Sequence, residues 1–171
     1  TCALPICHAA SLDEYLRYAA GGERPALAGG YPFPLGPLGT LYSANITPDT
    51  ETGFGRYSDA QIARMLRHGV RPDGQASIPL LMPFGDMSDE DVVGVLSFLR
   101  TLAPVSRVVP ENRWSLLGKV MRTFIAAAKP RLDVHPPKTA PPSEPTAVRG
   151  RYIAESVADC GGGHSLYNML T

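Results

Sequence analysis

Two cysteines stand shortly before histidines in this sequence, one pair towards each end. Cys7 directly precedes His8, and Cys160 stands four positions before His164 in Cys-Gly-Gly-Gly-His. In a Cys-x-x-Cys-His motif, two thiols bind the vinyl groups of a porphyrin covalently, and the histidine ligates the iron. These residue types therefore predict attachment of haem c, with Cys7 and Cys160 as binding thiols and the two histidines as iron ligands.

Both copies depart from the complete motif. Cys2 stands before Cys7 with four residues between the two thiols, and Gly163 takes the place of a cysteine ahead of His164. Cys160 can still form one thioether, so we predict one functional haem site in the first copy and an incomplete site in the second. A disulfide between Cys2 and Cys7, without haem, is the alternative for the first copy.

The first six residues carry a further signal. Thr-Cys-Ala-Leu-Pro-Ile is encoded by ACG TGT GCT CTT CCG ATC, which matches the end of a common sequencing-library adapter. We therefore expect the genuine protein sequence to begin at Cys7, and Cys2 to be encoded by the adapter. If Cys2 is genuine, the first copy is a Cys-x4-Cys-His site.

Amphipathic helices separated by long loops are expected to position these residues. Apolar side chains recur at helical spacing. Ser58 with Gln61 forms a capping-box pattern at one helix start, and an acidic first turn follows Ser88 at another. The predicted helices run from Ser58 up to Gly69, from Ser88 up to Pro104, over 113–128 and over 148–159. No strand pattern stands out, which predicts an all-α fold.

A proline-rich segment, residues 129–146, lies between the last two predicted helices. It contains prolines at positions 130, 136, 137, 141, 142 and 145. Because proline removes a backbone donor and fixes φ, we expect an exposed, semi-rigid tether.

The charge balance and the lengths of the apolar runs argue against a nucleic-acid-binding protein and against a membrane span in this sequence. Sixteen basic residues balance sixteen acidic ones, so the chain lacks the basic excess that a nucleic-acid partner requires. No run of about 18 apolar residues occurs, which argues against a membrane span in this sequence.

Six short motifs, in order along the chain, carry a resemblance. They are Ala28-Gly-Gly, Asn45-Ile-Thr-Pro-Asp, Thr52-Gly-Phe-Gly-Arg-Tyr-Ser-Asp, Leu66-Arg-His-Gly-Val-Arg-Pro-Asp-Gly, Met82-Pro-Phe and Met87-Ser-Asp-Glu-Asp-Val. Together they resemble the class I c-type cytochromes found as multihaem subunits of membrane-bound alcohol and sugar dehydrogenases. The resemblance covers residues 7–105 and restarts at Gly150-Arg-Tyr-Ile-Ala.

The resemblance implies a domain organisation. It predicts a first cytochrome c-like domain over 1–105 without its N-terminal helix, a connecting amphipathic helix over 106–129, a proline-rich linker over 130–146 and the N-terminal part of a second cytochrome c-like domain over 147–171.

The resemblance also implies a distal iron ligand, the Met82 thioether, opposite His8. The position suits this role, because Met82 lies in a proline-flanked loop between two predicted helices. The alternative is that Met82 fills the core, as most methionines do. Met87 and Met65 are rival ligands, although Met65 lies on the apolar face of a helix.

As a function, the resemblance implies an electron carrier and not an enzyme in its own right. Redox partner proteins are expected, with a dehydrogenase or quinol as donor and an oxidase-type acceptor. Covalent haem implies the periplasmic side of a bacterial membrane, and the full-length protein could be membrane-associated. Two alternatives stay open: a peroxidase-like haem enzyme with an open distal site, and a haem-free binding module.

Overall fold

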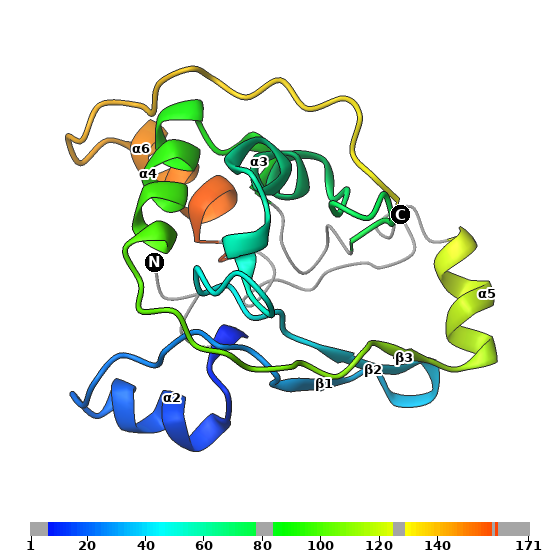
Figure 1. The fold of residues 1–171 in the computed structure, drawn as a ribbon. Coiled ribbons are helices and arrows are strands. Elements are labelled where there is room, and N and C mark those ends of the chain that lie inside the picture. Colours follow the sequence, from blue (N-terminus) through cyan, green and yellow to red (C-terminus); the bar gives the residue numbers. More distant parts are fainter. Residues whose placement is uncertain (1–6, 78–83, 125–128, 159, 161–171) are drawn as a thin grey trace. The chain divides into compact units, whose positions relative to one another are not determined.

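A computed structural model describes residues 7–77, 84–124, 129–158 and 160 of the chain (Figure 1). The chain folds as two compact units. Within the described ranges, the sheet unit comprises residues 7–58 and 97–121, and the helical unit comprises residues 59–77, 84–96, 122–124, 129–158 and 160.

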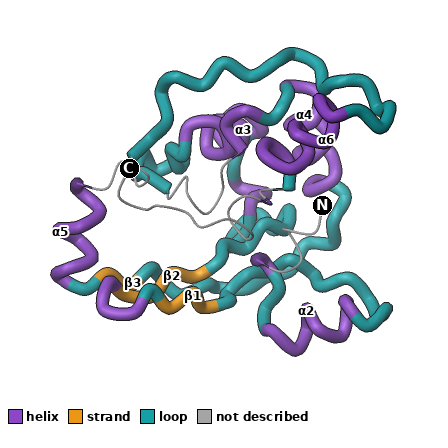
Figure 2. The backbone as a smooth tube through the Cα atoms, turned by 180° about the vertical axis from the view of Figure 1, so that it is seen from behind, coloured by secondary structure: helices purple, strands orange, loops and turns teal. Residues whose placement is uncertain are grey.

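The sheet unit contains a small antiparallel sheet in the order β1-β2-β3 (Figure 2). Its strands are β1 (Pro32–Pro34), β2 (Gly39–Tyr42) and β3 (Arg113–Trp114). This sheet corrects the expectation of an all-α fold. Strands of two to four residues are too short for polar and apolar side chains to alternate visibly, so no periodic signal marks them.

Two helices that lie wholly or mostly in the sheet unit follow local signals. Helix α2 (Leu12–Ala19) begins after Ser11, whose side chain accepts from the backbone of Glu14. Helix α5 (Leu116–Phe124) begins after Ser115, whose Oγ accepts from the Gly118 N–H at 3.0 Å. The helix predicted over 113–128 is thus confirmed for Leu116–Phe124, and residues 125–128 lie outside the described part.

The helical unit confirms the other predicted helices. They are α3 (Asp59–His68), α4 (Asp89–Arg100) and α6 (Ala147–Tyr152), which continues as the π-helical turn η6 (Ile153–Val157). The short 3-10 turn η4 (Phe84–Asp86) precedes α4. Apolar side chains at helical spacing are buried, namely Ile62, Leu66, Val92 and Leu96. The last four residues of α4 belong to the sheet unit.

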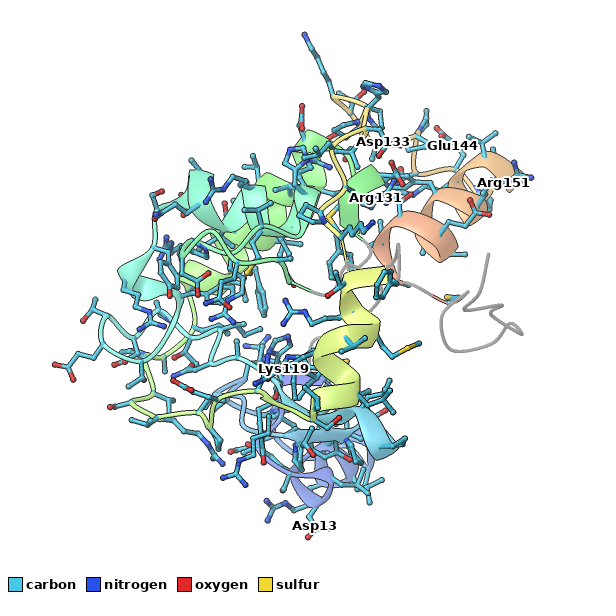
Figure 3. All side chains as sticks on the ribbon, turned by 90° about the vertical axis from the view of Figure 1, so that its right-hand side faces the viewer. Asp13, Lys119, Arg131, Asp133, Glu144 and Arg151 are labelled. Atoms are coloured by element: carbon cyan, nitrogen blue, oxygen red, sulfur yellow. The ribbon has the colours of Figure 1, made fainter. Side chains whose placement is uncertain are left out.

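The proline-rich segment 129–146 is not an exposed tether throughout. Arg131 exchanges hydrogen bonds with His68, through Arg131 N–H to His68 O at 3.0 Å and His68 Nδ1 to Arg131 O at 2.8 Å. The Asp89 N–H donates to Pro137 O at 3.0 Å. Prolines lack a donor but keep their carbonyl acceptors, so this segment can cap the N-terminus of a helix. Val134 of this segment is buried, whereas its neighbour Asp133, labelled in Figure 3, is exposed.

No helix within the described ranges is long and apolar enough to cross a membrane. The domain boundaries predicted at 105, 129 and 146 stay predictions.

Candidate functional site

His8 is enclosed by the sheet unit, with 6 % of its surface exposed. Its Nδ1 lies 2.9 Å from the carbonyl oxygen of Ala44, so Nδ1 carries the proton and donates it. Burial lowers the pKa of His8, and the hydrogen bond to Ala44 opposes this only in part. A neutral imidazole whose Nδ1–H is fixed by a carbonyl presents Nε2 as the metal-binding nitrogen, which is the usual arrangement of a ligating histidine.

Residues 27–30 hold the backbone of His8. The Gly29 N–H donates to His8 O at 2.9 Å, and Gly29 has a φ of 68°. A Cβ at Gly29 would collide with the backbone of Ala44, the residue that accepts from the His8 ring. Leu27, buried and also left-handed with a φ of 63°, accepts from the Ile46 N–H at 3.2 Å. Glycine is therefore required where the two chain segments meet around His8.

The Asn45-Ile-Thr-Pro-Asp motif fixes the position of Ala44. Asn45 is buried, and its Nδ2 donates to Val105 O at 2.8 Å and to Thr52 Oγ1 at 3.1 Å. Its Oδ1 accepts from the Thr47 N–H at 3.0 Å and from Thr47 Oγ1 at 2.8 Å. Thr47 Oγ1 in turn accepts from the Val105 N–H at 3.2 Å. One amide side chain thus ties its own loop to the segment that follows α4.

The aspartate of the same motif closes the turn that follows. Asp49 Oδ1 accepts from the Thr52 N–H at 2.6 Å, from Thr52 Oγ1 at 2.7 Å and from the Glu51 N–H at 3.2 Å. These hydrogen bonds, the one from the Thr52 backbone foremost, lower the pKa of Asp49. The motif is therefore a hydrogen-bonded scaffold that holds Ala44, the hydrogen-bond partner of His8. We do not assign its side chains as metal ligands.

Several known proteins have sequences similar to that of this chain. No protein-family profile matches the chain. It is 34 % identical, over 86 % of its length, to the gluconate 2-dehydrogenase cytochrome c subunit of Pantoea cypripedii. It is 33 % identical, over 94 % of its length, to the fructose dehydrogenase cytochrome subunit of Gluconobacter japonicus. It is 31 % identical over 96 % of its length to a dihaem c-type cytochrome of Cereibacter sphaeroides.

The chain is homologous to the cytochrome c subunits of sugar and alcohol dehydrogenases. It covers 34 % of the gluconate 2-dehydrogenase subunit, 35 % of the fructose dehydrogenase subunit and 53 % of the dihaem cytochrome. This cytochrome c homologue therefore spans about a third to a half of the length of these relatives.

The structure places three of the six predicted site residues of this cytochrome c homologue. Cys7 is half-buried beside His8, and Cys160 is exposed in the helical unit. Cys2, Met82 and His164 lie outside the described residues. Among the residues that are described, no group of three or more His, Cys, Asp and Glu side chains could hold a metal ion. The donor set at Cys7 and His8, one thiol and one neutral imidazole, fits haem c attachment.

The rival methionines lie in the helical unit. Met87 is buried between η4 and α4, and Met65 is half-buried on α3. Neither position decides which methionine binds iron, so the assignment of Met82 stays a prediction.

Three residues with structural roles in the described parts of the chain were not predicted from the sequence. Ala44 acts through its backbone oxygen, for which no side-chain signal exists. Arg67 is buried in α3 beside Leu66, and a charged residue next to a core position was the available sign. Tyr152 lies in the helix predicted over 148–159, and its buried hydroxyl makes hydrogen bonds that no sequence pattern indicated.

Proposed function

We propose that this chain transfers electrons through haem c bound at Cys7, with His8 as the proximal iron ligand. One observation carries the proposal: a buried, neutral histidine whose Nδ1 donates to Ala44 O follows directly on a cysteine. The homology to cytochrome c subunits supports it independently.

When bound, haem c supplies an iron that accepts and releases one electron. The residues of this chain have separate tasks around it. Cys7 forms a thioether, His8 presents Nε2 and Ala44 O orients the imidazole and raises its basicity as a ligand. The burial of His8 would keep water away from its imidazole when haem c is bound.

Met82 is proposed as the distal ligand, and Cys2, or a lost cysteine at a neighbouring position, as the second thiol. The support for Met82 is its place directly before Pro83-Phe84, between α3 and α4. A His/Met pair raises the reduction potential relative to two histidines, because the thioether favours ferrous iron. Cys160 and His164 form a second site that lacks one attachment thiol because position 163 is glycine.

The proposed partners are redox proteins. The relatives are named as cytochrome subunits of gluconate 2-dehydrogenase and fructose dehydrogenase, which supports a dehydrogenase or quinol as electron donor. We propose an oxidase-type acceptor, a location on the periplasmic side of a bacterial membrane, and membrane association of the full-length protein.

The visible spectrum of the purified chain, produced in a host with c-type maturation machinery, tests the proposal. We expect a Soret band that shifts on reduction, and one haem per chain by the pyridine haemochrome assay. Absence of a Soret band would favour the haem-free binding module instead. Binding of carbon monoxide by the reduced protein would favour the peroxidase-like alternative, because a methionine ligand resists it.

A further inference from the structure

Helix α5 turns an apolar face towards solvent. Five of its nine residues have large apolar side chains, with exposed fractions between 36 % and 80 %, namely Leu116, Leu117, Val120, Met121 and Phe124. On a helix of 3.6 residues per turn these positions lie on one side, and such a face ordinarily packs on the core. Figures 1 and 2 both show the helix projecting from the end of the sheet.

A different side of α5 holds the helix to its unit. Gly118 is buried, and a Cβ there would collide with Leu38 O, in the 3-10 turn η1 (Gly36–Leu38). The same turn holds the start of the helix: the Ser115 N–H donates to Leu38 O at 3.0 Å, and Ser115 Oγ donates to Pro37 O at 2.7 Å. The helix therefore approaches its own unit most closely at a glycine, where an apolar side chain would not fit.

The charged residues in and directly before α5 are all basic. Residues 113–124 contain Arg113, Lys119 and Arg122 and no acidic residue, although acidic and basic residues are equal in number over the whole chain. Arg113 and Lys119, the latter labelled in Figure 3, are exposed, and Arg122 is half-buried. An exposed apolar face accompanied by Lys and Arg is typical of helices that lie in the interface of an anionic bilayer.

Helix α2 of the same unit provides an internal contrast. It also leaves apolar side chains exposed, with Leu12 at 50 % and Leu16 at 51 %, and none of its residues is buried. Its first turn, however, carries Asp13 and Glu14. A surface of anionic lipids repels these carboxylates and attracts the basic residues of α5. Charge therefore distinguishes the two exposed helices.

The size of the exposed face of α5 argues against a protein as its occupant. A helix of nine residues is about 14 Å long. One face of it is far smaller than the roughly 800 Å² that each partner buries in a stable protein–protein interface. A bilayer requires no matching surface, because apolar side chains enter among the acyl chains while basic groups stay at the lipid phosphates.

We infer that α5 binds the surface of an anionic lipid bilayer. Its apolar face enters the boundary between headgroups and acyl chains, and Lys119 and Arg113 bind the lipid phosphates. The helix lies in the plane of the interface, since no helix within the described ranges is long enough to cross a membrane. This inference deepens the proposed membrane association, on which it rests, and it does not depend on haem.

The test measures the dissociation constant of the haem-loaded chain from lipid vesicles by co-sedimentation. Vesicles of mixed phosphatidylglycerol and phosphatidylcholine should bind the chain at least about tenfold more tightly than vesicles of phosphatidylcholine alone, and added salt should weaken this binding. Replacing two exposed leucines together, Leu116→Gln with Leu117→Gln, should weaken it at least about tenfold. Lys119→Gln should weaken it severalfold on the anionic vesicles only.

The matched control makes the same two substitutions on the other exposed helix of the unit, as Leu12→Gln with Leu16→Gln. It should leave binding unchanged, and equal losses in the two double variants would overturn the inference. Circular dichroism checks that each variant is folded. If the α5 double variant does not fold, Lys119→Gln and the salt dependence decide.

Three further results would contradict a lipid surface as the occupant. They are no binding of the unmodified chain to anionic vesicles, equal binding to both kinds of vesicle, and a dimer in solution that the α5 double variant abolishes. The last result would identify a second copy of the chain as the occupant. The haem content of the same samples reports on the proposed electron transfer separately, so either proposal can fail without the other.

Discussion

Two histidines of this chain, His8 and His68, each direct Nδ1 at a backbone carbonyl. The distances are 2.9 Å to Ala44 O and 2.8 Å to Arg131 O. His8 is buried and follows a cysteine, whereas His68 is half-buried in the last turn of α3. The same hydrogen bond thus occurs in two different settings, one in each unit of the chain.

The difference shows which features indicate a metal ligand. The acceptor of His8 is fixed by the buried amide of Asn45 and by Gly29, which holds the His8 backbone. The acceptor of His68 belongs to the proline-rich segment, and Arg131 N–H donates back to His68 O. The first arrangement orients an imidazole, and the second fastens a segment to a helix. Burial and a neighbouring thiol distinguish His8, the proposed ligand, from His68, and the hydrogen bond to a carbonyl alone does not.

The largest expected effect comes from replacing each histidine in turn. His8→Gln removes the proximal ligand, so we expect the haem content per chain to fall more than about tenfold. His68→Gln keeps a side-chain donor towards Arg131 O, and its haem content should equal that of the unmodified chain. Pyridine haemochrome assays on equal amounts of protein measure both. Equal haem in the two variants would show that the comparison has selected the wrong histidine.

A smaller effect is expected when the support of His8 is altered. Gly29→Ala forces a Cβ against the backbone of Ala44, and should lower the free energy of unfolding by more than about 1 kcal/mol and reduce haem incorporation. Gly74→Ala is the control, because Gly74 also has a positive φ, 82°, but open space where a Cβ would lie. Urea denaturation separates steric conflict from backbone strain. Identical losses in both variants would remove the special role of Gly29.

The smallest expected effect is a pH dependence in the haem-free chain. Burial lowers the pKa of His8 in the folded state, so the unfolded state binds more protons as the pH falls. The free energy of unfolding should therefore decrease as the pH falls through about 6.5, the ordinary value for histidine. His8→Gln should flatten this dependence. The measurement is urea denaturation at several pH values between about 8 and 5.

The helices were predictable because their signals are local. Apolar residues repeat every three to four positions in α3, α4 and α5, and each repeat is long enough to read. The sheet was not predictable, because β3 has two residues and β1 begins and ends with proline. Its pairing depends on residues that lie far apart in the sequence, such as Thr40 and Arg113.

The site was predictable only in part. A cysteine before a histidine identifies His8 from sequence, but the acceptor of its proton is a backbone oxygen at Ala44, 36 positions away. The Asn45 motif was recognisable as a family feature, whereas its role in fixing Ala44 required the hydrogen bonds to Val105. The proline-rich segment misled for a related reason, because the carbonyls of prolines still accept hydrogen bonds.

Haem staining of the chain on a denaturing gel tests whether Cys7 attaches haem c, because only covalently bound haem survives denaturation. The chain is compared with Cys7→Ala and Cys160→Ala, each produced with the c-type maturation machinery. We expect the unmodified chain and Cys160→Ala to stain equally, and Cys7→Ala to lose most of its stain. Undiminished staining of Cys7→Ala, or no staining of the unmodified chain, would contradict the attachment of haem c at Cys7.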